Sequence, residues 1–244
     1  MFRINFERSY SKDYEADWYG PFQPDFTLNT ALAARYWKLA SRGLDLDFDL
    51  EIPTGRVLEI GGGCSSHGHM LLENGAKSVV TVDLFAQRLM AVPIHDGLIK
   101  VAADAVSLPF DRAAAFDMVF SSLTMAHLTS LVPRVAREVH GVLRPGGIFC
   151  GLEINYYSPI SIARYFTRRH SKNSFVFYPH TLHGWLAAAG FQDIRMVPLN
   201  IRAPWLPAKS LISWLLGTCI FFSARANSAI PAKAGDHDQP YRAP

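Results

Sequence analysis

The sequence predicts an α/β fold in which a mostly parallel sheet is covered by helices on both faces. Short, continuously apolar runs alternate with helical segments, and such runs are typical of strands that are buried on both sides. The first run is followed at once by a glycine turn, as in the strand-to-helix units that bind ligands. The chain has 244 residues, a length that one α/β domain can fill.

Composition favours a folded enzyme. Apolar residues make up 49% of the chain and charged residues only 18%, which is below the usual quarter. The net charge of +3 is too small to argue for nucleic-acid binding. Cys64, Cys150 and Cys219 form neither a disulfide framework nor a zinc-ligand spacing, so we expect no metal site and a reducing, cytoplasmic location. The first residues, Met1–Glu7, lack the apolar run of a secretory signal.

Three parts are expected along the chain. Residues 1–50 are rich in aromatic side chains and are expected to form an N-terminal helical lid segment, with a helix from Thr27 to Arg42. Residues 51–225 are expected to form the ligand-binding domain. Residues 226–244 contain several prolines and few apolar residues, which predicts a disordered tail.

The strands of the sheet follow one another within the central part. The first five are expected at Arg56–Ile60, Ser78–Asp83, Ile99–Ala103, Phe116–Ser121 and Ile148–Ile154. A late helix beginning at Leu182 ends at Gly190, and two final strands follow it at Asp193–Leu199 and Thr218–Arg225. Because ligands bind beyond the carboxyl ends of the strands in an open α/β sheet, polar residues at these ends are the candidate site.

The glycine turn after the first strand is the most informative of these ends. Gly61, Gly62 and Gly63 have no Cβ atoms, so the backbone can approach a ligand closely, and the helix that follows begins with unpaired N–H groups. Asp83, at the end of the second strand, is placed to accept two hydrogen bonds from a ribose diol. The dinucleotide fingerprint is not met, because Ser66 stands where its third glycine would be. The pattern therefore predicts a nucleoside-containing cofactor that is less bulky and less anionic than a dinucleotide.

At this point the chain resembles the class I S-adenosylmethionine-dependent methyltransferases, in particular their small-molecule, type 11-like branch. The first motif of that family is similar to Val57–Ser65, and four later segments match in the same order: Val101–Phe110, Phe116–Leu128, Glu138–Phe149 and Leu182–Phe191. The resemblance covers roughly residues 55–225. It implies a Rossmann-like sheet of seven mostly parallel strands with the last strand antiparallel, and S-adenosyl-L-methionine as the cofactor.

The resemblance also implies a set of cofactor-binding residues. Gly61, Gly62 and Gly63 would lie against the methionine and ribose, and Asp83 would bind the ribose hydroxyls. Asp104 would accept a hydrogen bond from the adenine amino group, with Ala105 facing the ring. The remaining positions are Glu59, which orders the turn or the cofactor amine, Leu84, which packs on the adenine, and Ser121, which lies at the same edge.

Transfer of a methyl group from a sulfonium mainly needs the nucleophile close and in line. A general base is needed only where the acceptor is a weakly acidic alcohol or phenol. His127, just after the fourth strand, is the candidate catalytic residue, and a packed helix histidine is the alternative.

The predicted acceptor is a small or lipid-like molecule, apolar or anionic, and not nucleic acid. The N-P-P-[YF] motif that some family members use for base or amide nitrogens is absent, and Ser121–Thr124 stands in its place. An apolar stretch over 204–216 and a basic group over 164–172 suggest contact with such an acceptor or with a membrane surface, or else a core helix and a solvated loop. Lys209 and Gly217 interrupt the apolar stretch, so no transmembrane segment is expected.

Two other functions stay open from the sequence. One is a nicotinamide-dependent reductase, which Ser66 and the lack of a Tyr-x-x-x-Lys pair disfavour. The other is a non-catalytic module that keeps the methyltransferase fold as a binding partner.

Overall fold

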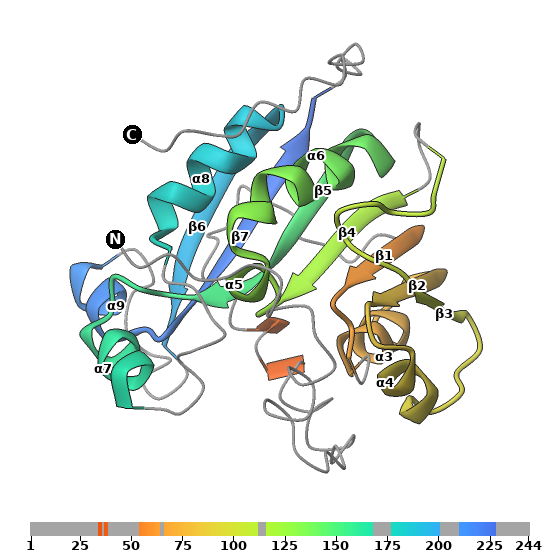
Figure 1. Cartoon of the computed structure of the whole chain (residues 1–244), viewed down its shortest axis with the longest axis horizontal. Helices are drawn as coiled ribbons and strands as arrows, with labels where there is room; N and C mark the ends of the chain where they lie inside the picture. The colour runs from red at the N-terminus through yellow and green to blue at the C-terminus, as the bar shows by residue number, and fades with distance from the viewer. Residues whose placement is uncertain are drawn as a thin grey trace.

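The computed structural model describes residues 34–35, 37–38, 54–63, 66–111, 116–167, 177–200 and 210–227. Its centre is a seven-stranded sheet in the order β3-β2-β1-β4-β5-β7-β6 (Figure 1). The strands are β1 Arg56–Ile60, β2 Ser78–Asp83, β3 Leu98–Ala102, β4 Phe116–Ser122, β5 Leu143–Ile154, β6 Phe191–Leu199 and β7 Cys219–Ala226. Strands β1 to β5 pair in parallel, whereas β7 is antiparallel to both β5 and β6. The predicted fold class is confirmed.

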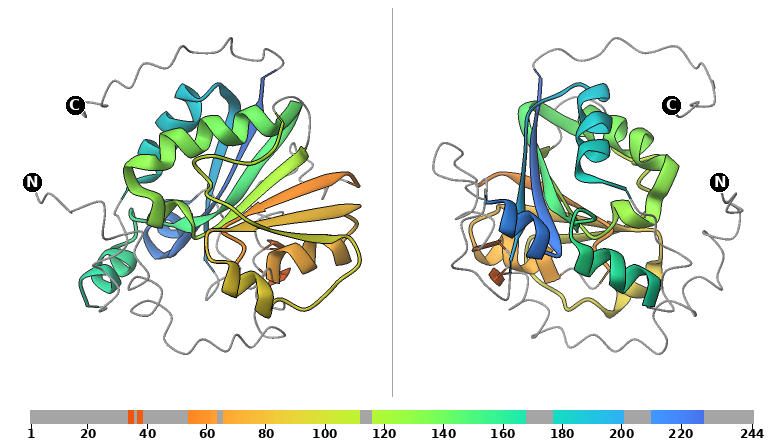
Figure 2. Two further views of the ribbon diagram at one scale, coloured as in Figure 1. Left: turned by 45° about the vertical axis from the view of Figure 1, so that its right-hand side comes forward. Right: turned by 90° about the vertical axis from the view of Figure 1, so that its left-hand side faces the viewer.

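Helices cover both faces of this sheet (Figure 2). They are α3 Ser66–Glu73, α4 Ala86–Ala91, α5 Met125–Leu128, α6 Val132–Val142, α7 Pro159–Thr167, α8 Pro179–Ala188 and α9 Leu211–Leu216, with a 3-10 turn at Thr129–Leu131. Alternate residues of a strand point to opposite faces. In β1, Leu58 and Ile60 accordingly join the core under α6 and α8, while Val57 joins the core under α3.

Strand β5 differs from its predicted bounds. It begins at Leu143, so the Pro145–Gly147 segment is part of the strand and not a turn before it. The pairing shifts here, since Phe116 is opposite Leu143 while Met118 is opposite Ile148. Gly146 has φ 75°, a left-handed conformation that glycine adopts readily. Residues 145–147 therefore form an irregularity in the pairing of β4 with β5.

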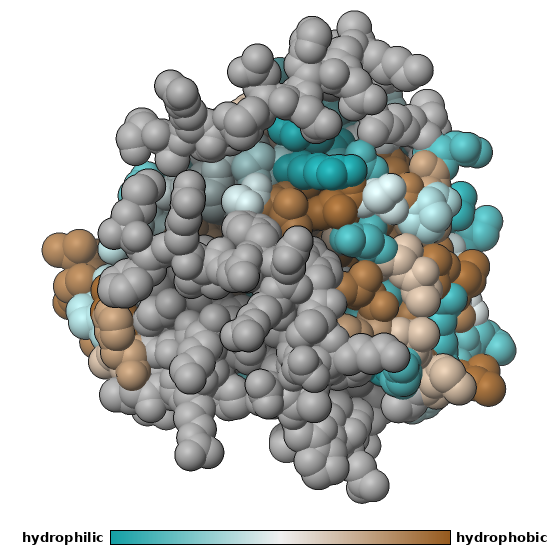
Figure 3. Space-filling view, in the orientation of Figure 1, coloured by the Kyte–Doolittle hydropathy of each residue, from teal (hydrophilic) through white to brown (hydrophobic). Residues whose placement is uncertain are grey.

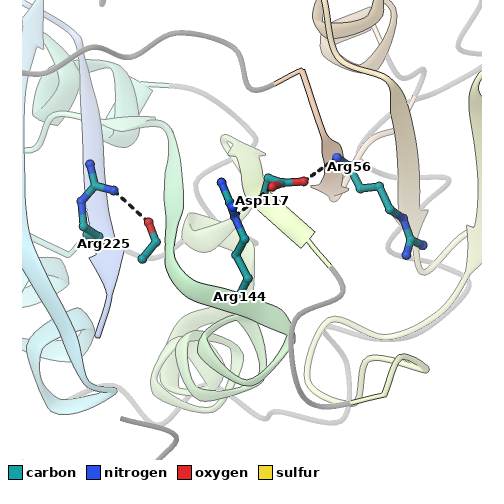
Figure 4. Close-up of polar contacts among 5 residues, drawn as sticks. Arg56, Asp117, Arg144 and Arg225 are labelled. Carbon is teal, nitrogen blue, oxygen red and sulfur yellow. Dashed lines mark hydrogen bonds and ion pairs between the residues drawn. The ribbon is translucent and has the colours of Figure 1, made fainter. Parts of the chain in front are cut away.

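The edge of the sheet opposite the predicted site is held by charged groups (Figure 4). Asp117 in β4 lies 2.8 Å from Arg144 in β5 and accepts a hydrogen bond of 2.7 Å from the Arg56 N–H in β1. Arg225 in β7 donates to the Gly146 carbonyl at 2.8 Å. Because the Arg144 side chain is 56% exposed, its pair with Asp117 contributes little to stability. These contacts mainly fix the register of neighbouring strands.

Little of the predicted lid segment falls within the described residues. Ala34, Arg35, Trp37 and Lys38 are helical, inside the helix expected at Thr27–Arg42. The Trp37 ring lies 6.0 Å from the rings of Phe120 and Phe221, between centroids, and so packs on the sheet. The rest of residues 1–50, the basic group beyond Thr167 and the tail beyond Asn227 lie outside the described residues. Among the helices that are described, none is long and apolar enough to cross a membrane.

Candidate cofactor site

The chain runs from β1 outward to β2 and β3 and then returns to β4 on the other side of β1. Such a reversal opens a crevice at the carboxyl ends of the two strands where it occurs, and ligands of open α/β sheets bind there. The turn Gly61–Gly63 follows β1 at this point, and the loop from β4 to α5 lies beside it.

The glycine turn is tied to the end of β2. The N–H groups of Gly61 and Gly62 donate to the Val82 carbonyl at 2.8 and 3.1 Å. Gly61 and Gly63 have φ of 66° and 52°. Residues with a Cβ rarely adopt such backbone angles. A Cβ on Gly61 would lie 2.3 Å from the Thr124 hydroxyl oxygen, whereas a Cβ on Gly63 would meet nothing within 4 Å. Gly61 therefore allows close packing, and Gly63 borders open space.

Asp83 shapes this turn as well as lying next to it. The carboxylate is only 6% exposed. One oxygen accepts from the Gly63 N–H at 2.9 Å and the other from the Phe85 N–H at 2.9 Å. A carboxylate has about four lone-pair positions in total, so acceptor capacity is left for a ribose diol. The sequence had suggested the diol contact alone and missed the contact with the turn.

Glu59 and Ser121 are buried inside the sheet. A Cβ on Gly62 would lie 2.9 Å from a Glu59 carboxylate oxygen, so Glu59 lies directly against the turn, where its predicted ordering role would place it. Ser121 is fully buried in β4, opposite Ile60 and Gly151 of the two neighbouring strands. Its hydroxyl has no partner among the described residues.

The loop after β3 brings the second acid to the same edge. The Ala103 N–H donates to the Asp83 carbonyl at 3.1 Å, which joins the ends of β2 and β3. Asp104 is half-buried, and its carboxylate accepts from the Val106 N–H at 3.0 Å, closing a local turn. Ala105 beyond it is buried, and Leu84 beside Asp83 is 41% exposed. The predicted ribose and adenine residues are thus brought together on three neighbouring loops.

The loop from β4 to α5 packs onto the glycine turn. The Thr124 hydroxyl donates toward the Ile60 carbonyl at 3.3 Å. Leu123 has φ 54°, in the left-handed region, and its N–H donates to the Leu152 carbonyl at 2.8 Å. Strain of this kind, about 1–3 kcal/mol, tends to occur at functional sites. His127 is half-buried in α5, three residues beyond Thr124, and its N–H donates to the Thr124 carbonyl at 3.0 Å.

Glu153 was missed by the sequence reasoning. It is fully buried near the end of β5, and one carboxyl oxygen accepts from the Met125 N–H at 2.8 Å, which holds the start of α5. The other oxygen has no partner among the described residues. Burial raises the pKa of Glu153 to about 8. The signal available in the sequence was a single acid within the otherwise apolar run Ile148–Ile154.

His67 was also missed, and no sequence signal marked it. It lies in the first turn of α3, with its ring centroid 5.0 Å from that of Phe120. Burial lowers the pKa of His67 to about 4, so the ring is neutral near pH 7. Its Nε2 has no partner among the described residues.

Glu153→Gln should change the pH dependence of stability. The pKa of Glu153 rises from 4.5 to about 8 on burial, so its contribution to stability is complete below pH 4.5 and is lost as the pH rises toward 8. Glutamine keeps a neutral side chain and an acceptor oxygen. We expect the difference in the free energy of unfolding, variant minus original chain, to increase by up to ~1.4 kcal/mol per pH unit between about pH 5 and 8. Urea unfolding across this range measures the difference, and a difference that does not vary with pH would contradict the assignment.

Comparisons with known proteins bear on the fold and on the segment from β1 to β5. A family model described as a methyltransferase domain matches residues 58–151. A solved S-adenosylmethionine-dependent methyltransferase from Mesorhizobium loti superposes with a TM-score of 0.61 at 22% identity, over 80% of this chain and 99% of that one. The likeness to the solved structure concerns the fold alone. The segment that the family model matches runs from β1 to β5.

Curated relatives carry more than one activity. The tRNA U34 carboxymethyltransferase of Methylococcus capsulatus is 32% identical over 155 residues, which are 59% of this chain and 47% of that protein. The mitochondrial arginine-hydroxylase NDUFAF5 of Danio rerio is 30% identical over 115 residues, or 47% of this chain and 35% of that protein. The chain thus spans about half the length, or less, of these two relatives.

The prediction that excluded nucleic acid as a partner is wrong. It depended on the missing N-P-P-[YF] motif and on a net charge of only +3, yet relatives named for their action on tRNA match more than half of this chain. A net charge averages over the whole molecule and says nothing of a local basic patch, and one motif does not represent every way of presenting an acceptor.

Proposed function

We propose that this chain, which carries a class I S-adenosylmethionine-dependent methyltransferase domain, is an enzyme that transfers a methyl group from S-adenosyl-L-methionine to an acceptor by in-line displacement. One observation carries the proposal: open space beside Gly63 adjoins the buried Asp83 carboxylate, which is 2.9 Å from the Gly63 N–H. A bare backbone next to an oriented carboxylate is suited to an adenosyl group.

The residues that are present fit this cofactor. The backbone of Gly61 and Gly63 would lie along the methionine and ribose, and Asp83 would accept from the ribose hydroxyls. Asp104 would accept from the adenine amino group, with Leu84 against the ring. When bound, the cofactor supplies a methyl group already activated by a positively charged sulfur.

The protein's own part in the reaction is mainly positional. The Thr124 hydroxyl holds the β4–α5 loop against the end of β1, beside the glycine turn, and the Leu123 N–H ties the loop to β5. Glu153 holds the first N–H of α5. These contacts fix the wall on which an acceptor nucleophile would be aligned. Alignment of this kind accounts for much of the rate of a displacement reaction.

His127→Ala tests whether a proton is removed from the acceptor. If His127 is the base for an alcohol or phenol, we expect kcat to fall by ~10²-fold or more at unchanged cofactor affinity. Product formation measured against pH with labelled cofactor gives the answer, and calorimetry with S-adenosylhomocysteine controls for binding. An unchanged rate would leave His127 as a packing residue.

The acceptor is a further part of the proposal. The relatives named above differ in activity, and they match this chain over 155 and 115 residues, so these matches do not decide the acceptor. A small-molecule acceptor and a tRNA acceptor are therefore both candidates, the second because the Methylococcus relative is named for tRNA.

Incubation of the full chain with methyl-labelled cofactor and a cell extract tests the proposal. The fraction that carries the label distinguishes the two classes of acceptor. Label recovered in RNA that ribonuclease releases would favour the tRNA-type acceptor, and label in a low-mass organic fraction would favour the small molecule. An Asp83→Ala control should incorporate far less. No label in any fraction would favour a non-catalytic module, and calorimetric binding of NADPH but not of S-adenosylhomocysteine would favour a reductase.

A further inference from the structure

Three exposed rings form a surface that the cofactor site does not use. Tyr157 follows β5, and Tyr178 and His180 lie at the start of α8. Tyr157 is 38% exposed and Tyr178 is 41% exposed, and His180 is exposed as well. We call these three side chains the ring platform.

The rings of the platform share one orientation. Tyr178 and His180 are 8° from parallel, and Tyr157 makes angles of 24° and 21° with them. The three centroid distances are 5.6, 5.7 and 5.9 Å, so the centroids form a triangle and not a column. The Tyr157 hydroxyl and His180 Nδ1 share a hydrogen bond of 2.6 Å. Because a ring nitrogen bonds within the plane of its ring, Tyr157 and His180 lie side by side and not face to face.

Buried neighbours hold the backbone of the platform in place. The residue before Tyr157 and the residue before Tyr178 are the buried Tyr156 and Phe177, whose rings meet edge to face at 6.5 Å. Asn155, fully buried, accepts from the Tyr157 N–H at 3.1 Å and donates to carbonyls of α9 and its end at 2.8 and 2.7 Å. A surface ordered before binding loses less conformational entropy when a ligand arrives.

The platform lies at the same edge of the sheet as the cofactor residues. Strand β5 is parallel to β4 and β1, so Tyr157 follows a carboxyl end, as Gly61 does. Strand β6 runs in the same direction as β5, since both are antiparallel to β7, and α8 therefore begins at this edge. The cofactor loops follow β1, β2 and β3, whereas the platform lies beyond β5, with α7 and α9 (Figures 1 and 2). Exposed apolar side chains of α9 lie on this side of the molecule, namely Leu211, Ile212, Leu215 and Leu216. Figure 3 shows hydrophobic surface at the left margin, where Figure 1 places α9.

Building on the proposed function, we propose that the ring platform binds a planar ring of the acceptor. The Trp214 ring of α9 packs against Tyr157 at 5.8 Å between centroids, and all three platform rings keep exposed surface. Exposed aromatic side chains with a shared orientation stack on planar rings, and base–aromatic stacking is a common way to hold an unpaired nucleobase. A nucleobase in single-stranded RNA and a free aromatic compound offer the same chemistry, so the experiment separates these sources.

The test uses the full chain with S-adenosylhomocysteine present. Fluorescence anisotropy follows a labelled single-stranded oligoribonucleotide of mixed sequence and an abasic oligomer of the same phosphate number. Calorimetry measures the binding of 4-hydroxybenzoate, which serves as the free aromatic compound. Tyr157→Ala and Tyr178→Ala remove platform rings, while Tyr157→Phe keeps the ring. Phe166→Ala removes an aromatic ring that is 77% exposed on α7 and does not belong to the platform.

We expect each alanine variant of the platform to weaken binding of the base-bearing oligomer by ~10-fold or more. Tyr157→Phe, Phe166→Ala and the abasic oligomer should show no such loss. The same variant pattern with 4-hydroxybenzoate, and not with RNA, would support a small aromatic acceptor. If the tyrosine variants bind every ring-bearing probe as the original chain does, the platform proposal is overturned. Failure of the original chain to bind S-adenosylhomocysteine would instead overturn the proposed function.

Discussion

Asp83→Ala is expected to weaken binding of S-adenosylhomocysteine by ~10- to 150-fold. The carboxylate accepts from the N–H groups of Gly63 and Phe85, both at 2.9 Å, and is proposed to accept from the ribose hydroxyls. Its removal therefore takes away the ribose contact and also releases the glycine turn that faces the cofactor. Loss of hydrogen bonds to a charged group amounts to about 1.5–3 kcal/mol, which corresponds to the stated range.

Calorimetry with S-adenosylhomocysteine measures this effect, and Asp96→Ala provides the matched control. Asp96 is an exposed acid in the loop before β3, away from the glycine turn in the sequence. Its variant should bind as the original chain does. Equal affinity of the Asp83 variant and the control would mean that the adenosyl group does not lie against Asp83.

Gly151→Ala is expected to destabilise the fold by ~3 kcal/mol or more. A Cβ at this position would lie 2.0 Å from the Ser121 carbonyl oxygen in β4 and 3.1 Å from the Phe222 ring in β7. The nearest obstacle is backbone within a central strand pair, so it cannot rotate away. Relief requires β4 and β5 to separate, and overpacking of this kind is among the few mechanisms that give large losses of stability.

Urea unfolding of Gly151→Ala and of Gly184→Ala would test this expectation directly. Gly184 lies within α8, and a Cβ there would meet nothing within 4 Å. Alanine is favoured over glycine inside a helix by roughly 0.5–1 kcal/mol, so the control should be slightly stabilised. Comparable stability of the two variants would show that the sheet accommodates the extra methyl group by a small shift.

The strands were predictable because their buried faces impose continuous apolar runs. Strand β1 has its predicted bounds, and β3 starts one residue earlier than expected, at Leu98. The early start of β5 was not predictable, because Pro-Gly-Gly is typical of a turn. Only the pairing of Phe116 with Leu143 keeps the segment in the sheet.

The candidate site was predictable where one strand end carries one informative residue. The glycines, Asp83 and Asp104 satisfied that condition, and the structure brings their loops together. Contacts between distant segments were not predictable. Thr124 reaches the Ile60 carbonyl across 64 positions, and Tyr157 meets His180 across 23. Helices and strands are recognised by a hydrophobic pattern that repeats along the sequence. A contact between two distant side chains produces no such pattern.

Strand β7 lies between β5 and β6 although it is made after both. During synthesis on a ribosome, β6 therefore has no neighbour to pair with, and β5 keeps an open side, until residues 219–226 have emerged. Unpaired strand edges promote association with other chains. Nascent chains that stall before this point would thus need protection by chaperones that completed chains do not.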